Sequence, residues 1–195
     1  VPMVAAVMFV LGAGIQHTLI TPSLGTKSFT NLLFLTVGLG LLLSNGALVI
    51  FGSEYRSIRT AYSQTYIPMG PVTISLPRMI SFGVLIVVTI ALFAFLKYTT
   101  VGKQIRAVSQ NPVGAEVVGI DVKKIYLLTY GLGVALAGTA GALLTQFYTI
   151  FPTAGASFGF RALIVVVVGG LGSIPGAFLA GIFLGLLETM SALFI

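Results

Sequence analysis

The residues of this chain that could do chemistry are few and lie far apart in the sequence. The acidic residues are Glu54, Glu116, Asp121 and Glu188, the single histidine is His17, and there is no cysteine. Acid–base catalysis and metal binding need such groups to converge, and this spacing shows neither an acid–base pair nor a metal-ligand motif. The sequence therefore predicts no catalytic set, no metal site and no cofactor held by the chain itself.

A glycine-rich stretch, LIVVVVGGLGSIPGA at residues 163–177, resembles a strand that runs into a phosphate-binding loop. The dinucleotide fingerprint requires G-x-G-x-x-G, and counting from Gly170 the third glycine position holds Pro175. In a membrane, residues 162–174 would make only about 20 Å of helix, which is too short to cross. We therefore predict a broken or re-entrant helix near residues 161–176. The residues of this break are Gly169, Gly170, Gly172, Ser173 and Pro175.

Two interpretations of this break stay open. Unwound backbone at membrane depth is tolerated where it lines a cavity, and such breaks often mark transport sites. A kink without any contact to substrate is the other interpretation. Glu188 also has two interpretations. It is either an ordinary charge near the membrane surface, or a charge within the membrane that is functional or paired.

Charged residues concentrate in one segment, residues 97–124. Seven of the fourteen charged residues lie there: Lys97, Lys103, Arg106, Glu116, Asp121, Lys123 and Lys124. Within this segment Pro112 disfavours helix at Asn111, so we expect Asn111 to cap a short helix that starts at Pro112 and ends at Gly119. Ala115, Val117 and Val118 would then form an apolar edge beside Glu116. Such an edge could dock into a groove of another protein, or lie as an amphipathic loop at the membrane surface.

The elements that position these residues must be membrane helices. The chain is 57% hydrophobic and 7% charged, against about 25% charged residues in soluble domains. Four of its neutral windows are long enough for helices of about 20 residues, and the remaining window, residues 79–96, has 18. The apolar runs are continuous, which favours helices over a barrel. The fold class is all-α: a polytopic membrane helical bundle in contact with lipid. The net charge of +6 is spread over loops without interleaved aromatic residues, so nucleic-acid binding is not expected.

We predict a single transmembrane domain over residues 1–195. Its spans are expected near residues 2–20, 32–51, 79–96, 125–147 and 176–195. The connections on one side carry Lys27, Lys97, Lys103, Arg106, Lys123 and Lys124, and those on the other carry Arg56, Arg59, Arg78 and Arg161. The positive-inside rule then places residues 99–124 in the cytoplasm. The chain starts at Val1 and stops inside apolar sequence at Ile195, so it is expected to be incomplete at both ends.

Small residues mark the expected helix contacts. Small residues that are spaced by four positions lie on one face of a helix and allow helix backbones to approach closely in lipid. The candidates are Ala137, Gly138, Gly141, Gly181 and Gly185.

Three stretches together resemble the ABC-transporter permeases of the branched-chain amino acid type, the LivH-like family: residues 102–124, 137–148 and 163–188. The matching residues are Gly102, Arg106, Ala107, Gln110, Asn111, Pro112, Ala115, Gly119, Ile120, Ala137, Gly138, Ala140, Gly141, Gly169, Gly170, Gly172, Ser173, Gly176 and Ala177. The resemblance is specific over about half of the chain.

The resemblance implies a permease that does not hydrolyse ATP itself. Its partners would be a second related permease, two cytoplasmic ATPase subunits that bind ATP and Mg, and an extracytoplasmic solute-binding protein, all at the prokaryotic inner membrane. It further implies that residues 99–124 form the segment that couples to the ATPase. The coupling residues would be Gly102, Arg106, Ala107, Asn111, Pro112, Ala115, Glu116, Gly119 and Ile120. The translocation path or broken helix would hold Gly169, Gly170, Gly172, Ser173, Pro175 and Glu188.

The implied cargo is a branched-chain or other small neutral amino acid. Two alternatives stay open: a permease for urea or short amides in the same family, and a channel or secondary transporter that works without an ATPase.

Overall fold

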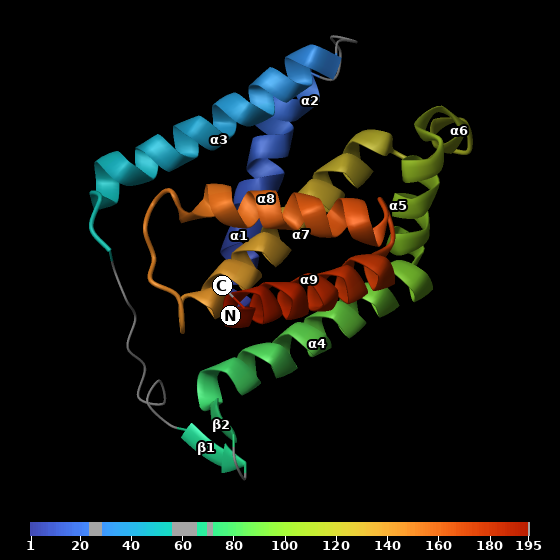
Figure 1. Cartoon of the computed structure of the whole chain (residues 1–195). Helices are drawn as coiled ribbons and strands as arrows, with labels where there is room; N and C mark the ends of the chain where they lie inside the picture. Colours follow the sequence, from blue (N-terminus) through green and yellow to red (C-terminus); the bar gives the residue numbers. More distant parts are fainter. Residues whose placement is uncertain (24–28, 56–65, 70–71, 195) are drawn as a thin grey trace.

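The computed structural model describes residues 1–23, 29–55, 66–69 and 72–194. These residues form helices and one short hairpin (Figure 1). The elements, in order, are α1 (Pro2–Ile15), the π-helix η1 (Gln16–Ile20), α2 (Thr21–Ser23), α3 (Phe29–Phe51), β1 (Tyr66–Met69), β2 (Val72–Ser75), α4 (Leu76–Tyr98), α5 (Thr100–Gln110), α6 (Pro112–Val117), α7 (Val122–Leu144), α8 (Ala154–Gly169) and α9 (Ile174–Phe194). Lys27, Arg56, Arg59 and Ile195, which entered the predictions above, lie outside the described residues.

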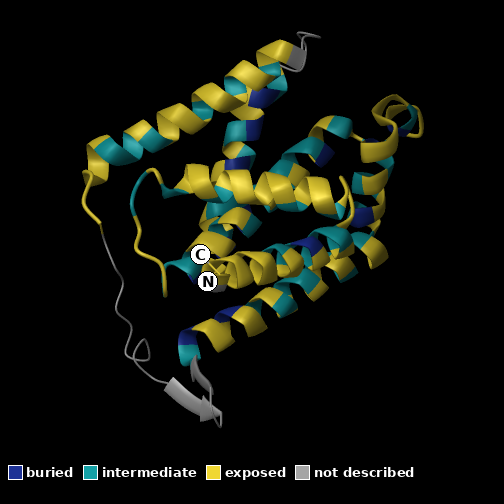
Figure 2. Cartoon of the chain, viewed as in Figure 1, coloured by how far each residue is buried: buried dark blue, intermediate teal, exposed yellow. Residues whose placement is uncertain are grey.

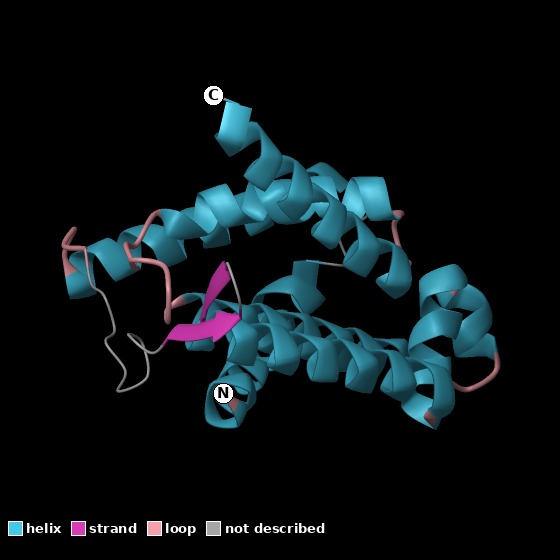
Figure 3. Cartoon of the chain, turned by 60° about the horizontal axis from the view of Figure 1, so that its bottom comes forward, coloured by secondary structure: helices cyan, strands magenta, loops and turns pink. Residues whose placement is uncertain are grey.

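Five helical stretches are long and apolar enough to cross a membrane. They are Pro2–Ile20, Thr30–Phe51, Leu76–Tyr98, Val122–Leu144 and Ile174–Ala192, with 19 to 23 residues each. On α3 and α9 the large apolar side chains are mostly exposed, as for Phe34 at 72% and Val49 at 86%, and yellow dominates these two helices in Figure 2. Helix α7 differs, because its large apolar side chains are half-buried or buried. Exposed apolar surfaces such as those of α3 and α9 are stable in contact with lipid and unfavourable in contact with water. The chain is thus an all-α, multi-pass membrane bundle. The antiparallel β1–β2 hairpin, magenta in Figure 3, lies in the connection before α4.

Helices α1 and α7 pack closely along each other. A Cβ atom added to Gly12 would lie 2.7 Å from Cβ of Val134, and one added to Gly138 would lie 2.5 Å from Cγ of Met8. The glycines therefore let the two backbones approach more closely than larger residues would allow. Gly138, one of the candidate packing residues, thus lies in the contact between α1 and α7. Gly131, against the Phe9 ring, is a further close approach in this interface.

Helices α8 and α9 form a hairpin around a glycine turn. Gly170 and Gly172 have φ values of +88° and +87°, a left-handed backbone that glycine adopts without steric cost. Ser173 then caps α9, since its Oγ accepts a hydrogen bond of 3.1 Å from the Gly176 N–H. Pro175 lies in the first turn of α9, where its missing N–H is harmless.

The start of the broken helix differs from the expectation. Helix α8 begins at Ala154 and not near residue 162, so it has 16 residues, or about 24 Å. Arg161 consequently lies inside α8 and not in a connection, so it no longer counts among the charges expected in the connections opposite residues 99–124. The interruption itself falls at residues 170–173, within the predicted stretch.

Candidate functional site

The corner between α4 and α5 is held by three residues of the charged segment. A Cβ atom on Gly102 would lie 2.5 Å from both Cα and the carbonyl oxygen of Leu96, so only glycine fits against the α4 backbone. Arg106, one turn later, donates from Nη1 to the same Leu96 carbonyl. Thr99 caps α5, because its Oγ1 accepts a 3.0 Å hydrogen bond from the Gly102 N–H. Gly102 and Arg106 therefore fix the direction in which α5 leaves α4.

Helix α6 forms through local signals. Asn111 Oδ1 accepts a 3.0 Å hydrogen bond from the Gly114 N–H, and Pro112 occupies the first turn. Gly119, with φ of +86°, ends the turn that follows the helix. Asp121 then starts α7, since its Oδ1 accepts a 3.1 Å hydrogen bond from the Lys124 N–H. Three side-chain caps thus define α5, α6 and α7 within 23 residues, 99–121.

A small apolar cluster supports α6 from within. Val108 of α5, Ala115 of α6 and Ile125 of α7 are each at most 5% exposed and pack together. Ile120 packs against the same cluster. The expectation that Ala115 lies on the exposed apolar edge is therefore wrong. The side of a two-turn helix that faces inward depends on these tertiary contacts, which the sequence pattern of six residues does not determine.

Three valines are the large apolar residues exposed on α6 and the turn after it. Val113 is 70% exposed, Val117 82% and Val118 75%. Glu116 is exposed beside them, as is Gly119. Figure 1 shows α6 projecting at the end of the molecule that is formed by α5 and the start of α7. Helices α5 and α7 thus hold in place an exposed apolar tip, formed by Val113, Val117 and Val118, with the acidic Glu116 beside it.

Asp121 offers a pH-dependent test of this geometry. Hydrogen bonds from the backbone and side chain of Lys124 lower the pKa of Asp121 below 3.8. A group whose pKa is lower in the folded state stabilises that state above its unfolded pKa, and this stabilisation is lost as the pH falls through the folded pKa. We expect the first turn of α7 to fray only below pH 3.8. NMR titration of the Asp121 carboxyl would show this, and Asp121→Asn, which keeps the acceptor, should remove the pH dependence.

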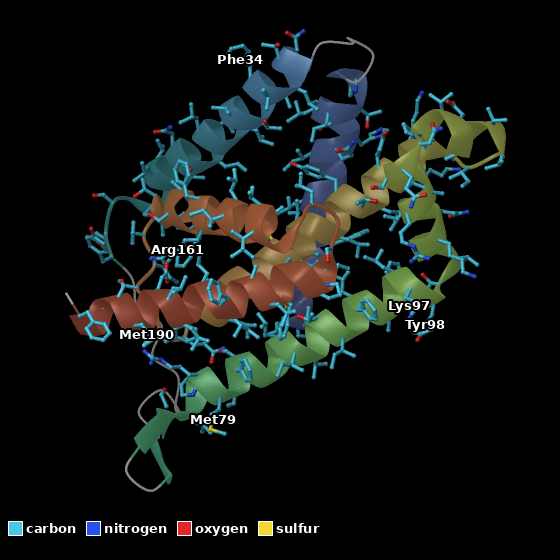
Figure 4. The ribbon with its side chains drawn as sticks, turned by 45° about the vertical axis from the view of Figure 1, so that its right-hand side comes forward. Phe34, Met79, Lys97, Tyr98, Arg161 and Met190 are labelled. Carbon is cyan, nitrogen blue, oxygen red and sulfur yellow. The ribbon has the colours of Figure 1, made fainter. Side chains whose placement is uncertain are left out.

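An ion pair joins the two helices of the glycine hairpin. Arg161 Nε lies 3.2 Å from Glu188 Oε1, and Figure 4 shows Arg161 extending from α8 towards α9. These are the two charged residues of residues 154–194. An unpaired charge at the centre of a membrane helix costs about 3 kcal/mol, so pairing removes much of that penalty. Sequence reasoning considered Glu188 alone and missed Arg161; the signal was that the two opposite charges flank one glycine turn.

A cavity of about 650 Å³ lies between the end of α7 and the start of α8. Two of the expected packing residues, Ala137 and Gly141, line it, and nothing lies within 4 Å of a Cβ atom added to Gly141. Gly181 faces Val165 of α8 across the hairpin, at 3.9 Å from its Cγ1. Gly185 has no such neighbour among the described residues. Gly169 and Gly176 lie against each other at the crossing of α8 and α9.

Catalytic or metal-binding groups do not gather in the part of the chain that the structure describes. Within those residues no three His, Cys, Asp or Glu side chains come together. The two arrangements that stand out are therefore the exposed tip on α6 and the Arg161–Glu188 ion pair between α8 and α9.

Comparison with known proteins identifies relatives along the whole chain. The family described as "Branched-chain amino acid transport system / permease component" matches residues 1–195. The high-affinity branched-chain amino acid transport system permease protein LivH of Escherichia coli K12 is 37% identical over 107 residues, which cover 54% of this chain and 35% of LivH. BraD, the permease protein of the same description in Pseudomonas aeruginosa, is 32% identical over 161 residues, which cover 80% of this chain and 52% of BraD.

A sugar permease is also similar. The ribose import permease protein RbsC of Escherichia coli K12 is 31% identical over 109 residues, which cover 52% of this chain and 34% of RbsC. No solved structure matches the chain. The chain spans about a third of LivH and about half of BraD.

Proposed function

Because this chain belongs to the family of branched-chain amino acid transport system permease components, we propose that it acts in an ATP-driven importer of branched-chain or other small neutral amino acids. It would form part of the membrane path, in the inner membrane of a prokaryote. The names of LivH and BraD support this class of cargo. ATP and Mg would bind to partner subunits, and this chain would hydrolyse nothing.

The observation that carries the proposal is the exposed tip on α6. Three valines that are at least 70% exposed project from α6 and the turn after it, and α6 is capped at Asn111 and supported by the buried Ala115. Apolar side chains of a short helix are suited to a groove in another protein. We propose that this tip seats in a cytoplasmic ATPase subunit and that Gly102, Arg106, Ala107 and Ile120 keep it in position.

The supports of α6 could transmit movement from the tip to the spans. Val108 and Ile125 clamp Ala115 between the helix before α6 and the helix after it. Gly102 and Arg106 tie α5 to the end of α4. A displacement of α6 would therefore move α4 and α7 together, and α1 with α7. Such rigid movement of bundles is how alternating access is achieved in membrane transporters.

The partners proposed for this chain follow from the same role. Two ATPase subunits would each need a docking tip, so a second related permease would supply the other. An extracytoplasmic solute-binding protein would deliver the amino acid on the opposite face.

A charge placed on the tip tests the proposal. Val117→Asp in the complete transport system should lower ATP-dependent leucine uptake at least about tenfold, because it would bury an unpaired charge at the centre of the proposed interface, where hot-spot residues contribute about 2 kcal/mol or more. Co-purification of the ATPase with the permease should fall in parallel, while the thermal stability of the permease stays unchanged. Ser109→Asp adds the same charge on exposed α5 and serves as the matched control. Full ATPase association and uptake in Val117→Asp would contradict the proposal.

Competition for uptake tests the cargo. In proteoliposomes with the complete system, excess leucine, isoleucine and valine should suppress uptake of labelled leucine, and urea should not. Suppression by urea or short amides would favour the amide alternative. Leucine uptake that persists without ATPase subunits would favour a channel or secondary transporter.

A further inference from the structure

The Arg161–Glu188 ion pair is placed where a ligand could reach both charges. The two side chains are 47% and 49% exposed, so neither is sealed inside the helix hairpin. All other residues from 154 to 194 are uncharged. A pair that served only to join α8 and α9 could have been replaced by apolar residues, since ion pairs rarely stabilise more than well-packed hydrophobic contacts do.

Aromatic rings connect this pair to the cavity between α7 and α8. Arg161 Cζ lies 5.7 Å from the centre of the Phe158 ring, and the Phe158 ring meets the Tyr148 ring edge-on at 5.7 Å. Phe158 and Tyr148 both line the cavity of about 650 Å³. The rest of its wall is largely alanine, glycine and aliphatic residues, with Thr145 and Thr149 as the other polar side chains. The cavity is large enough for an aliphatic side chain. Arg161 and Glu188 do not line it, and Phe158 is the residue that contacts both the cavity and the Arg161 guanidinium.

The position along α7 sets the side from which the cavity is reached. Helix α7 starts next to α6, and the cavity lies beside its other end, at Leu144 and Thr145. The 23 residues of α7 separate the two ends by about 34 Å. If α6 faces the cytoplasm, the cavity and the ion pair lie towards the outer face, where an imported molecule first enters.

We propose that Arg161 and Glu188 bind the carboxylate and the ammonium group of a zwitterionic amino acid, whose aliphatic side chain enters the cavity beside Phe158. The inference rests on the proposed function and names the residues that would recognise its cargo. Arg161 can grip a carboxylate with two parallel hydrogen bonds. Glu188 accepts hydrogen bonds from the ammonium group.

Charge balance explains why a zwitterion fits this pair. A zwitterion brings one positive and one negative group, so each protein charge exchanges one partner for another and no charge is left unpaired in the membrane. Urea, an amide or a sugar would leave both charges without an ionic partner when it separated them. The pair would therefore favour amino acids over neutral solutes of similar size.

Direct binding measurements on the complete permease–ATPase complex in lipid nanodiscs test the inference without the solute-binding protein. Labelled leucine should bind to the wild type. Binding should weaken at least about tenfold in Arg161→Gln and in Glu188→Gln, because each variant loses one charged hydrogen bond to the ligand. Leucinamide, which lacks the carboxylate, and isocaproate, which lacks the ammonium group, should not compete. Arg78→Gln, which removes an arginine from the first turn of α4, is the matched control and should bind leucine as the wild type does.

The charge-exchange variant R161E/E188R separates recognition from structure. It restores an ion pair between α8 and α9, so its thermal stability should approach that of the wild type, while leucine binding and uptake stay low because the ligand would have to reverse its orientation. Arg161→Lys keeps the charge without the planar fork, and should also keep stability and lose affinity. Wild-type leucine binding in R161E/E188R or in Arg161→Lys would overturn the inference, as would competition by isocaproate or no binding to the wild type.

These outcomes are distinct from a failure of the proposed function. Suppose that the wild-type system takes up leucine with ATP and that R161E/E188R takes it up fully. The importer proposal would then stand, and recognition of the amino acid by this ion pair would be overturned. No ATP-dependent amino acid uptake by the wild-type system would overturn the proposed function itself.

Discussion

Replacing Gly102 with alanine should give one of the largest losses of stability in this chain. The new Cβ atom would lie 2.5 Å from Cα and the carbonyl oxygen of Leu96 and 2.5 Å from the carbonyl oxygen of Phe95. All three are backbone atoms, so no side chain can rotate away. Relief would require α5 to move off the end of α4, which would break the Arg106 bond to Leu96. We expect a loss of about 3 kcal/mol, the upper range for overpacking.

Thermal unfolding of the purified permease in detergent measures this effect. Gly83→Ala is the matched control, because Gly83 lies in α4 and nothing is within 4 Å of its added Cβ atom. In a helix this control should be neutral or slightly stabilising. A Gly102→Ala variant as stable as Gly83→Ala would mean that α5 does not pack against α4 as described. Uptake should also fall in Gly102→Ala, since the tip on α6 would lose its fixed position.

The local signals of the charged segment could be predicted because they act over three residues. An asparagine followed by proline predicts a cap and a first turn, and the structure has both at Asn111 and Pro112. The role of Gly102 and Arg106 in the α4–α5 corner was not predictable in this way. Their partner, the backbone of Leu96, belongs to another helix, and nothing in the side-chain pattern of α5 reveals how close that backbone comes.

The start of α8 shows a second limit of sequence reasoning. Gly155, Ser157 and Gly159 lower helix propensity, and Arg161 suggested the edge of the membrane. The helix nevertheless begins at Ala154, and Arg161 pairs with Glu188 of the following helix. Whether a charge ends a membrane helix or lies within it depends on its partner in space. The positions of Arg161 and Glu188 could be explained only from the hairpin of α8 and α9, which brings the two charges together.

The turn of that hairpin was easier to predict than its packing. Consecutive glycines before a proline predict an interruption, and Gly170 and Gly172 take up the positive φ that it requires. Gly169 and Gly176 have a different role, because they let the two helices cross with their backbones in contact. Gly185, spaced by nine residues from Gly176, has no neighbour within 4 Å of an added Cβ atom. The sequence spacing of small residues does not distinguish these cases.

Gly176→Ala should be the second substitution with a large effect. Its Cβ atom would overlap the carbonyl oxygen of Gly169 and lie 2.8 Å from Ser173 Oγ, the capping atom of α9. The backbone of Gly169 cannot yield without opening the hairpin, so we expect a loss of about 3 kcal/mol. Separation of α8 from α9 would also part Arg161 from Glu188 and leave two unpaired charges in apolar helices.

A cross-link across the hairpin reports this separation directly. The chain has no cysteine, so the pair Val165→Cys and Gly181→Cys, whose parent residues face each other, can be joined by disulfide formation. In the Gly176→Ala background the cross-link should form more slowly and to a lower extent, with a lower melting temperature. Gly185→Ala on the same helix should change neither quantity. If Gly176→Ala cross-links as the parent does, α8 and α9 are held together by contacts other than their crossing at Gly169, and the ion pair would then be the first contact to remove.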